Sequence, residues 1–258
     1  MQAGSSGSVR GRSMKENEER ETDTRRQAQK KTSALRELLS WLEIIVAAVL
    51  IAFVLNTFII ANSRIPSGSM ENTIMTNDRV VGLRLSYTFG DPKRDDIAIF
   101  RFGWICNRHP QVSGEGEAPE TCPLDGEKIS HPKPLYYVKR VIGLPGDVID
   151  IKPEGSVRAG DLAELPPGIS PDGTDKELVT AALYVNGEKI EEPYLHEPML
   201  YSNEMQTHFE VPENCYLMLG DNRNNSGDAR YWNNPYISED KMVAKVLFRY
   251  WPRPALLH

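Results

Sequence analysis

Two serines in a turn-like segment are the first residues of this sequence that suggest chemistry. Ser67 and Ser69 belong to Ile-Pro-Ser-Gly-Ser-Met, residues 65–70. A serine is a poor nucleophile at neutral pH and needs a base within hydrogen-bonding distance. The five histidines lie in loops or at the end of the chain, and none forms a compact motif with an acid. The base must therefore be sought among other residue types, and the alternative is that both serines simply form a turn.

Lys139 is the best candidate for that base. The pKa of a lysine, ordinarily about 10.4, must fall by several units, and burial without a partner carboxylate has this effect. Leu-Tyr-Tyr-Val precedes Lys139, and two aliphatic residues follow Arg140. A strand here would carry the amine inward, where it could take the proton of Ser69. The alternative is an ordinary strand lysine whose amine reaches solvent beside Arg140.

A third segment, residues 220–230, combines turn residues with charges. Its first three residues, Gly-Asp-Asn, favour a tight turn. Asp228 and Arg230 are two positions apart, so in an extended strand they point to the same side and can form an ion pair. An exposed pair contributes about 0–1 kcal/mol. We therefore expect this pair to position other groups rather than to stabilise the fold.

The serines closely follow an apolar run, residues 44–61, in which only Asn56 and Thr57 are clearly polar. With the Leu and Trp residues just before it, the run reaches about 20 residues, enough to span a bilayer. A cleaved secretory signal is disfavoured because Ile59 is too large for the cleavage site. A buried core helix is disfavoured because the run lacks a polar face. The positive-inside rule places the N-terminus in the cytoplasm and residues 62–258 outside, given Arg25, Arg26, Lys30, Lys31 and Arg36 before the run and Arg64 and Arg79 after it.

The charge distribution excludes a typical nucleic-acid-binding protein. The chain has a net charge of −6, and residues 61–258 carry 29 acidic and 21 basic side chains. A nucleic-acid binder needs a basic folded part. Residues 1–32 are polar and highly charged, so we expect a disordered cytoplasmic tail.

The remainder of the chain is predicted to be mostly β, with antiparallel sheets. Short apolar runs alternate with turn residues, and Asn186-Gly187 lies at the centre of a predicted hairpin. We expect a transmembrane helix at 33–61 followed by a catalytic β domain at 62–151 and 211–258. Residues 103–134 form a loop insertion in this domain, without clear strands, and residues 152–210 form a smaller inserted β subdomain.

Three cysteines, Cys106, Cys122 and Cys215, remain to be explained. Cys106, His109, Cys122 and His131 could form a zinc site, but their spacing matches no strong zinc pattern. A disulfide between the two loop cysteines, or unpaired thiols, is favoured over a metal. We therefore expect no metal and no cofactor.

Taken in order, these segments resemble the bacterial type I signal peptidases, in the single-anchor form of Gram-positive members. The resemblance covers roughly residues 38–252, and its specificity comes from the ordered set of motifs rather than from any one of them. Asp95 stands where the family commonly has Gly, and Asn224 and Asn233 also depart from the usual pattern. The resembling segments are residues 65–74, 91–100, 136–147, 220–232 and 248–252.

The resemblance implies a role for each candidate residue. Ser69 is the nucleophile and Lys139 is the general base. The Ser69 backbone N–H and the Ser67 hydroxyl form the oxyanion hole. Ser226 holds the amine of Lys139, and Asp228 and Arg230 brace the site.

The resemblance also implies the substrate and the partners. The substrate is a preprotein with a signal peptide, cleaved after small residues at −1 and −3, and we expect a monomer attached to the bilayer.

Two other classes of protein remain open at this point. One is a self-cleaving repressor-type Ser-Lys protease, which would need a DNA-binding domain. The other is an anchored β-domain that binds a partner without catalysis.

Overall fold

The computed structural model describes Glu37 and residues 39–165 and 173–257. The predicted tail, residues 1–32, lies outside these residues, as do the basic residues before the apolar run. The described part of the chain divides into two units, with the boundary between Leu55 and Asn56.

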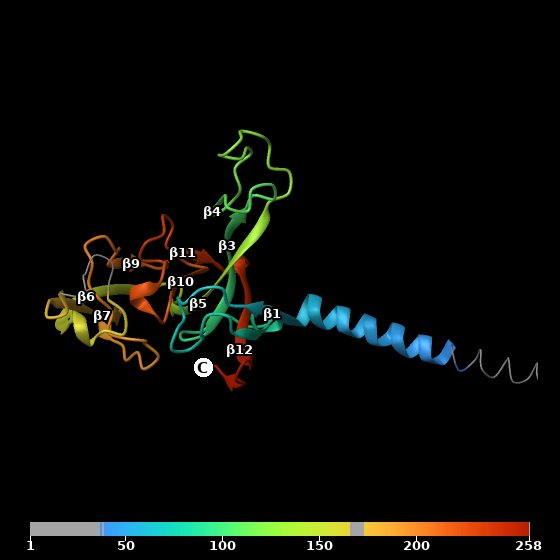
Figure 1. The fold of residues 1–258 in the computed structure, drawn as a ribbon, viewed down its shortest axis with the longest axis horizontal. Coiled ribbons are helices and arrows are strands. Elements are labelled where there is room, and N and C mark those ends of the chain that lie inside the picture. Colours follow the sequence, from blue (N-terminus) through green and yellow to red (C-terminus); the bar gives the residue numbers. More distant parts are fainter. Residues whose placement is uncertain (1–36, 38, 166–172, 258) are drawn as a thin grey trace, which may run out of the picture. The chain divides into compact units, whose positions relative to one another are not determined.

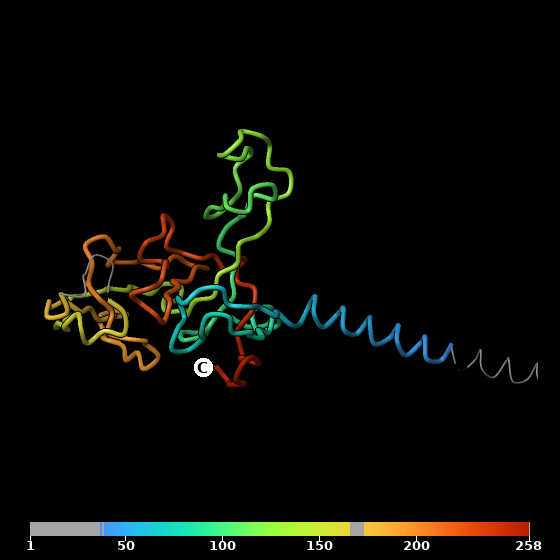
Figure 2. The backbone as a smooth tube through the Cα atoms, in the orientation of Figure 1, coloured from blue at the N-terminus to red at the C-terminus, as the bar shows by residue number. Residues whose placement is uncertain are grey.

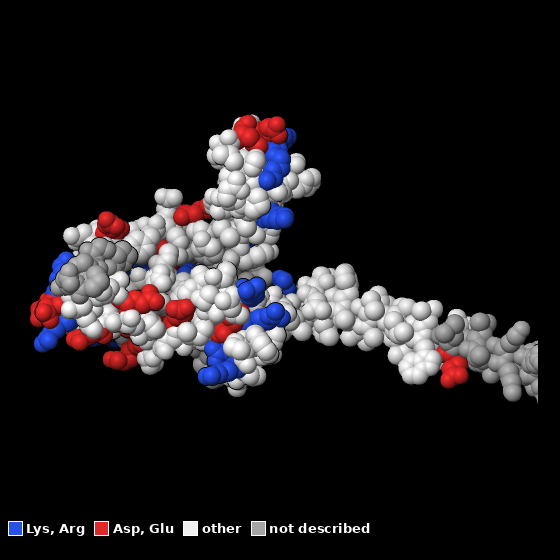
Figure 3. Space-filling view, in the orientation of Figure 1, with Lys and Arg blue, Asp and Glu red and all other residues white. Residues whose placement is uncertain are grey.

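The apolar run forms a helix, Leu39–Ile59, that is long and apolar enough to cross a membrane. Its large hydrophobic side chains are exposed, and in Figure 3 its surface is almost uninterrupted white. The last turn, Leu55–Ile59, widens into a π-helix. Strand β1 begins at Ile60, so the helix ends two residues before the predicted boundary.

Most strands belong to one antiparallel sheet. In the part of the chain that is described, its order is β1-β2-β12-β3-β5-β10-β11, with β4 added to β3 and β13 to β12 (Figure 1). The prediction of a mostly antiparallel β fold is therefore confirmed. The strands are β1 (Ile60–Arg64), β2 (Arg79–Leu83), β3 (Ile97–Ile105), β4 (Ser113–Glu115), β5 (Lys133–Gly143), β10 (Cys215–Leu219), β11 (Tyr236–Ser238), β12 (Met242–Trp251) and β13 (Ala255–Leu256).

A second, four-stranded sheet has the order β8-β7-β6-β9. Strands β7 and β8 form the predicted hairpin, since Asn186 and Gly187 have φ angles of 53° and 88°, as a type I′ turn requires. The sheet begins four residues before the predicted subdomain. Its strands are β6 (Val148–Arg158), β7 (Glu177–Val185), β8 (Glu188–Lys189) and β9 (His208–Glu210).

One large hydrophobic cluster joins the two sheets, because it includes Phe100 and Leu217 of the first sheet and Leu183 of the second. A smaller cluster packs Met70 and Ile74 against Val80 and Ala244. This smaller cluster fixes the segment that carries the two serines to the main sheet.

The predicted loop insertion contains more regular structure than expected. Strand β3 extends to Ile105, β5 begins at Lys133, and the two pair along this whole length. The sequence hid this extension because Gly and Pro interrupt its apolar pattern. Beyond the paired strands, residues 106–132 form what we call the arm, which includes β4 and is the green segment beyond β3 in Figure 2.

Candidate active site

Ser69 lies in a turn that follows β1. The backbone N–H of Ile74 donates to the carbonyl of Met70 at 2.8 Å, and both of these side chains are buried. Ser69 itself is half-buried, and its Oγ lies 3.5 Å from the Oγ of Ser67. Buried neighbours thus hold the turn while the two hydroxyls stay accessible.

Lys139 is buried in β5, with 3% of its surface exposed. Its Nζ donates a hydrogen bond to the Oγ of Ser226 at 2.9 Å. Burial lowers the pKa of Lys139 to about 8, the Asp228 carboxylate opposes this shift, and the Arg230 guanidinium adds to it. The alternative considered from the sequence, an ordinary strand lysine whose amine reaches solvent, is therefore excluded because Lys139 is buried.

Ser69 and Lys139 line the same cavity, which has a volume of about 430 Å³. Ser67 lines it as well. Ser226 is not among the lining residues but is bonded to Lys139, which is. No histidine of the described residues lines this cavity. Other parts of its wall come from residues 63–66, residues 135–138, Met70, Asn225 and Gly227.

Asp228 and Arg230 form the predicted ion pair, but in a different setting. Arg230 Nε and Nη2 donate to the Asp228 carboxylate at 2.8 and 2.9 Å. The pair is fully buried and lies in a turn. The expectation of an exposed pair in an extended strand is therefore wrong. Burial raises the pKa of Asp228, but the charge and hydrogen bonds of Arg230 outweigh this, and the pKa lies below its usual range. Asp228 also accepts the N–H of Gly220 at 3.0 Å, which fixes the loop.

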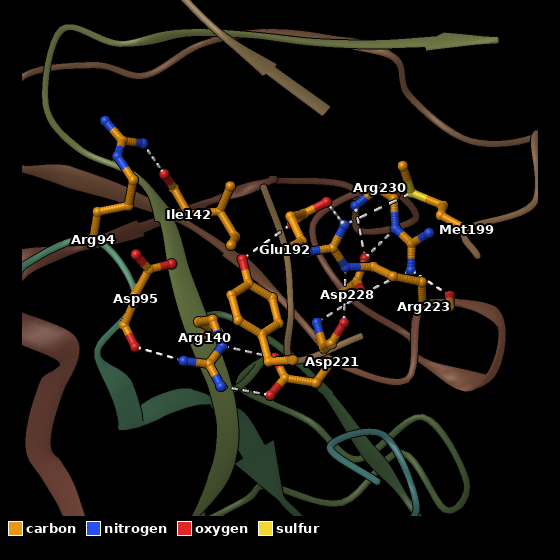
Figure 4. A network of polar contacts seen from close by, with 12 residues as sticks. Arg94, Asp95, Arg140, Ile142, Glu192, Met199, Asp221, Arg223, Asp228 and Arg230 are labelled. Atoms are coloured by element: carbon orange, nitrogen blue, oxygen red, sulfur yellow. Dashed lines mark hydrogen bonds and ion pairs between the residues drawn. The ribbon is translucent and has the colours of Figure 1, made fainter. Parts of the chain in front are cut away.

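A second buried pair, Arg140 with Asp221, was not identified from the sequence (Figure 4). Arg140 donates two hydrogen bonds to the Asp221 carboxylate, at 2.8 and 2.7 Å. Thr73, in the turn that follows Ser69, donates to the same carboxylate. The sequence feature that could have identified this pair is an arginine within an apolar run, next to Lys139. Adjacent strand residues point to opposite faces, so Lys139 faces the cavity and Ser226, whereas Arg140 faces Asp221.

Asn222 ties the loop directly to the serine turn. Its backbone N–H donates to the carbonyl of Ser69 at 3.2 Å, and its Nδ2 donates to the carbonyl of Gly68 at 3.1 Å. Glu192 and Arg223 form a further buried pair on the other side of the loop. The loop at 220–230 therefore connects the serine turn, strand β5 and the segment that carries Glu192.

Gly220 lies in this loop with the Ser69 carbonyl and the Ser226 side chain close beside it. A Cβ at this position would overlap the Ser69 carbonyl oxygen and the Ser226 hydroxyl, and would lie 2.7 Å from the Ser226 Cβ. We expect Gly220→Ala to destabilise the fold by about 1–3 kcal/mol, as overpacking does, and to reduce activity by displacing Ser226 from Lys139. The thermal unfolding midpoint in detergent and the rate of peptide cleavage measure the two effects.

Gly227→Ala provides the matched control for that substitution. A Cβ on Gly227 would meet no atom within 4 Å. Its unfolding midpoint should equal that of the wild type. Equal midpoints for Gly220→Ala and Gly227→Ala would show that the close approach at Gly220 is not required.

Asp95, which departs from the resemblance noted above, has a φ of 70°. This left-handed conformation favours Gly and is tolerated by Asp. The departure thus has a backbone explanation and leaves the cavity unchanged.

One cavity thus brings together two hydroxyls and a buried lysine, which is a combination suited to hydrolysis. Comparison with known proteins shows the family of the chain. The family model described as "Signal peptidase, peptidase S26" matches residues 38–161 and 170–251. The chain therefore belongs to this family of serine peptidases.

Individual relatives show the same similarity. A probable signal peptidase I-2 from Synechocystis sp. is 31% identical over 218 residues, which cover 83% of this chain and 75% of the relative. Signal peptidase I from Pseudomonas fluorescens is 30% identical, over 81% of this chain and 71% of the relative. Signal peptidase IB from Staphylococcus aureus is 27% identical, over 86% of this chain and 94% of the relative.

Proposed function

We propose that this chain is a membrane-anchored endopeptidase that removes signal peptides from exported preproteins with a Ser69–Lys139 dyad. The proposal depends on one observation: Lys139 is buried, its amine is bonded to Ser226, and the residue lines the same cavity as Ser69. Membership of the signal peptidase family supports the substrate class.

The first step is attack by Ser69 Oγ on the scissile carbonyl carbon, while Lys139 Nζ accepts the hydroxyl proton. The carbonyl oxygen becomes an oxyanion, for which the Ser69 N–H and the Ser67 hydroxyl are the donors. One such donor contributes about 2.7–4 kcal/mol to the transition state.

The second half of the reaction releases both products. The Lys139 ammonium gives its proton to the leaving amine, which departs as the new N-terminus of the mature protein. Water then attacks the acyl-enzyme ester while Lys139 accepts a proton from that water. The bond between the acyl carbon and Ser69 Oγ breaks, the signal peptide leaves as a carboxylate, and Lys139 returns the proton to Ser69 Oγ. Ser226, Asp228 and Arg230 position the amine and the loop around it.

The cavity wall suggests how a substrate binds. Residues 135–138 of β5 line the cavity, and β10 pairs with β5 only from Arg140 onward. The edge of β5 beside the cavity is therefore open to an extended peptide, which would bind as an added strand. Small residues at −1 and −3 would fit the shallow apolar wall beside Met70.

The helix Leu39–Ile59 would anchor the enzyme, with the N-terminus in the cytoplasm and the catalytic part outside. An anchor shared with the substrate's membrane raises the effective concentration of the two partners. We infer a monomer, and the acidic excess of the folded part disfavours nucleic acid as a partner.

The test is the cleavage of a purified model preprotein by the full-length chain in detergent, with sequencing of the new N-terminus. Cleavage once, after a small residue at −1, supports the proposal. A folded wild-type chain that leaves several such preproteins intact would instead favour an anchored binding module. Cleavage of the chain itself alone would favour the self-cleaving class.

The pH dependence separates a lysine base from a histidine base. Because Lys139 must be neutral to accept a proton, kcat/KM should rise with pH through an apparent pKa of about 8. A histidine base would give this rise an apparent pKa of about 6.5. The measurement is a pH profile of kcat/KM with a peptide that has no titratable side chains, and a rise completed below neutral pH would contradict the assignment.

A further inference from the structure

The arm contains a cluster of metal-binding side chains that the proposed peptidase mechanism does not use. His109, Cys122 and Asp125 bring their ligand atoms within 4.8 Å of one another. The Sγ of Cys106 lies 3.7 Å from the Sγ of Cys122, and both thiols are buried. A thiol, an imidazole and a carboxylate of the arm therefore lie within 4.8 Å of one another, and a second thiol lies beside the first.

The spacing of the four residues forms two short turns, Cys-x-x-His at 106–109 and Cys-x-x-Asp at 122–125. In the second turn the N–H of Gly126 donates to the carbonyl of Cys122 at 2.8 Å, and Gly126 has a φ of 70°. In the first turn the N–H of Cys106 donates to the carbonyl of Val112 at 2.8 Å. Paired turns that each offer two ligands are the usual form of a structural zinc site.

We propose that Cys106, His109, Cys122 and Asp125 bind one structural zinc ion. A tetrahedral zinc with Zn–S bonds of about 2.3 Å requires a sulfur–sulfur separation of about 3.8 Å, and the thiols lie 3.7 Å apart. His109 Nε2 and Asp125 Oδ2 are 2.8 Å apart as a hydrogen-bonded pair. They need to separate by about 0.6 Å to act as two tetrahedral ligands at about 2.1 Å. The Cys106 thiol, which is not part of the group within 4.8 Å, needs to move closer to this pair.

The surroundings of the cluster suit a zinc ion. The N–H of Glu127 donates to Asp125 Oδ1 at 3.0 Å, which leaves Oδ2 directed toward His109. Arg108 Nη2 also donates to both oxygens of the Asp125 carboxylate, each at 3.2 Å. Two thiolates and one carboxylate exceed the charge of Zn²⁺ by one, and the Arg108 guanidinium offsets this excess. Such outer contacts orient the ligands of a metal site.

The arm also needs a crosslink of this kind. Its buried apolar cluster consists of Cys106, Cys122 and Ile129 together with Trp104 of β3, and partly buried Val112 and Ala118 pack against it. A core this small rarely stabilises a fold without a metal or a disulfide. The sequence directed attention to His131, but this side chain is exposed and lies outside the cluster, and Asp125 takes its place.

Zinc content of the full-length chain in detergent tests the proposal. The chain is prepared without a polyhistidine tag, reduced, supplied with zinc sulfate, dialysed and analysed by mass spectrometry for metal. We expect one zinc per chain, and its loss in Cys122→Ser. Asp125→Asn should weaken zinc binding by about tenfold or more. Cys215→Ser and His131→Asn are the matched controls, which should keep the zinc.

Cobalt provides a second measurement that needs no variant. Co²⁺ added to the reduced wild type should give the intense visible bands of a tetrahedral site and thiolate charge-transfer bands in the near ultraviolet. Equal zinc in folded Cys122→Ser and wild type would mean adventitious binding and would overturn the proposal. A reduced wild type that binds neither metal, with a Cys106–Cys122 disulfide in the untreated protein, would overturn it as well.

Discussion

Replacing Lys139 by methionine is expected to reduce the cleavage of a model preprotein by about 10⁴-fold or more, as for other residues that act as a catalytic unit. Methionine keeps an unbranched chain of similar length but has no amine to accept the proton of Ser69. The residual rate, measured in single-turnover assays at saturating enzyme, should no longer rise through an apparent pKa of about 8.

The same substitution should not destabilise the chain. Because the pKa of Lys139 is lowered to about 8 in the folded state, the unfolded state binds this proton more tightly. The resulting destabilisation is fully present below about pH 8 and disappears as pH rises toward the ordinary lysine pKa of about 10.4. It amounts to about 3 kcal/mol at neutral pH, so Lys139→Met should unfold at or above the wild-type midpoint.

Lys133→Met is the control, because Lys133 is exposed on the same strand. Its activity and pH profile should match those of the wild type. A Lys139→Met chain that is folded and still cleaves at more than a few per cent of the wild-type rate would exclude Lys139 as the base.

Ser69→Ala is the second substitution with a very large expected effect. Without the Ser69 hydroxyl no acyl-enzyme forms, and the cleavage rate should fall by about 10⁴-fold or more. The unfolding midpoint should stay close to that of the wild type, because Ser69 is fixed by its backbone bond to Asn222 rather than by its hydroxyl. Mass spectrometry of the wild type, acid-quenched during turnover of a slow ester substrate, should show an adduct on Ser69 that the variant lacks.

Ser156→Ala, at an exposed position of β6, controls for the loss of a hydroxyl elsewhere. It should keep full activity. An adduct on Ser67 in the wild type, with cleavage retained by Ser69→Ala, would assign the nucleophile to the other serine of the turn.

The candidate residues could be identified from the sequence because each of them stands in a recognisable local pattern. Ser67 and Ser69 stand in a short turn after an apolar run, and Lys139 is a charge inside a run of strand-forming residues. Asn186-Gly187 defined a hairpin because its turn type depends on two residues alone. The helix was predicted for the same reason, since membrane-spanning length is a property of a continuous segment.

Contacts between distant segments were not predictable in this way. The Asp221 carboxylate is an acceptor for Arg140, 81 positions earlier, and for Thr73, 148 positions earlier. Asp228 and Arg230 looked like an exposed pair because burial depends on what packs over them. Asp125 was overlooked beside His131 because the folding of two turns, and not residue type, decides which side chains meet Cys122.

The amino-acid order by itself determined the anchor-like helix, the alternating strands and which side chains have suitable chemistry, because these depend on neighbours within a few residues. Tertiary structure alone decided that Lys139 is buried, that its amine is bonded to Ser226, and that the residue lines the same cavity as Ser69. The physical reason is that desolvation, which lowers the pKa of Lys139, is produced by segments that meet only when the chain folds.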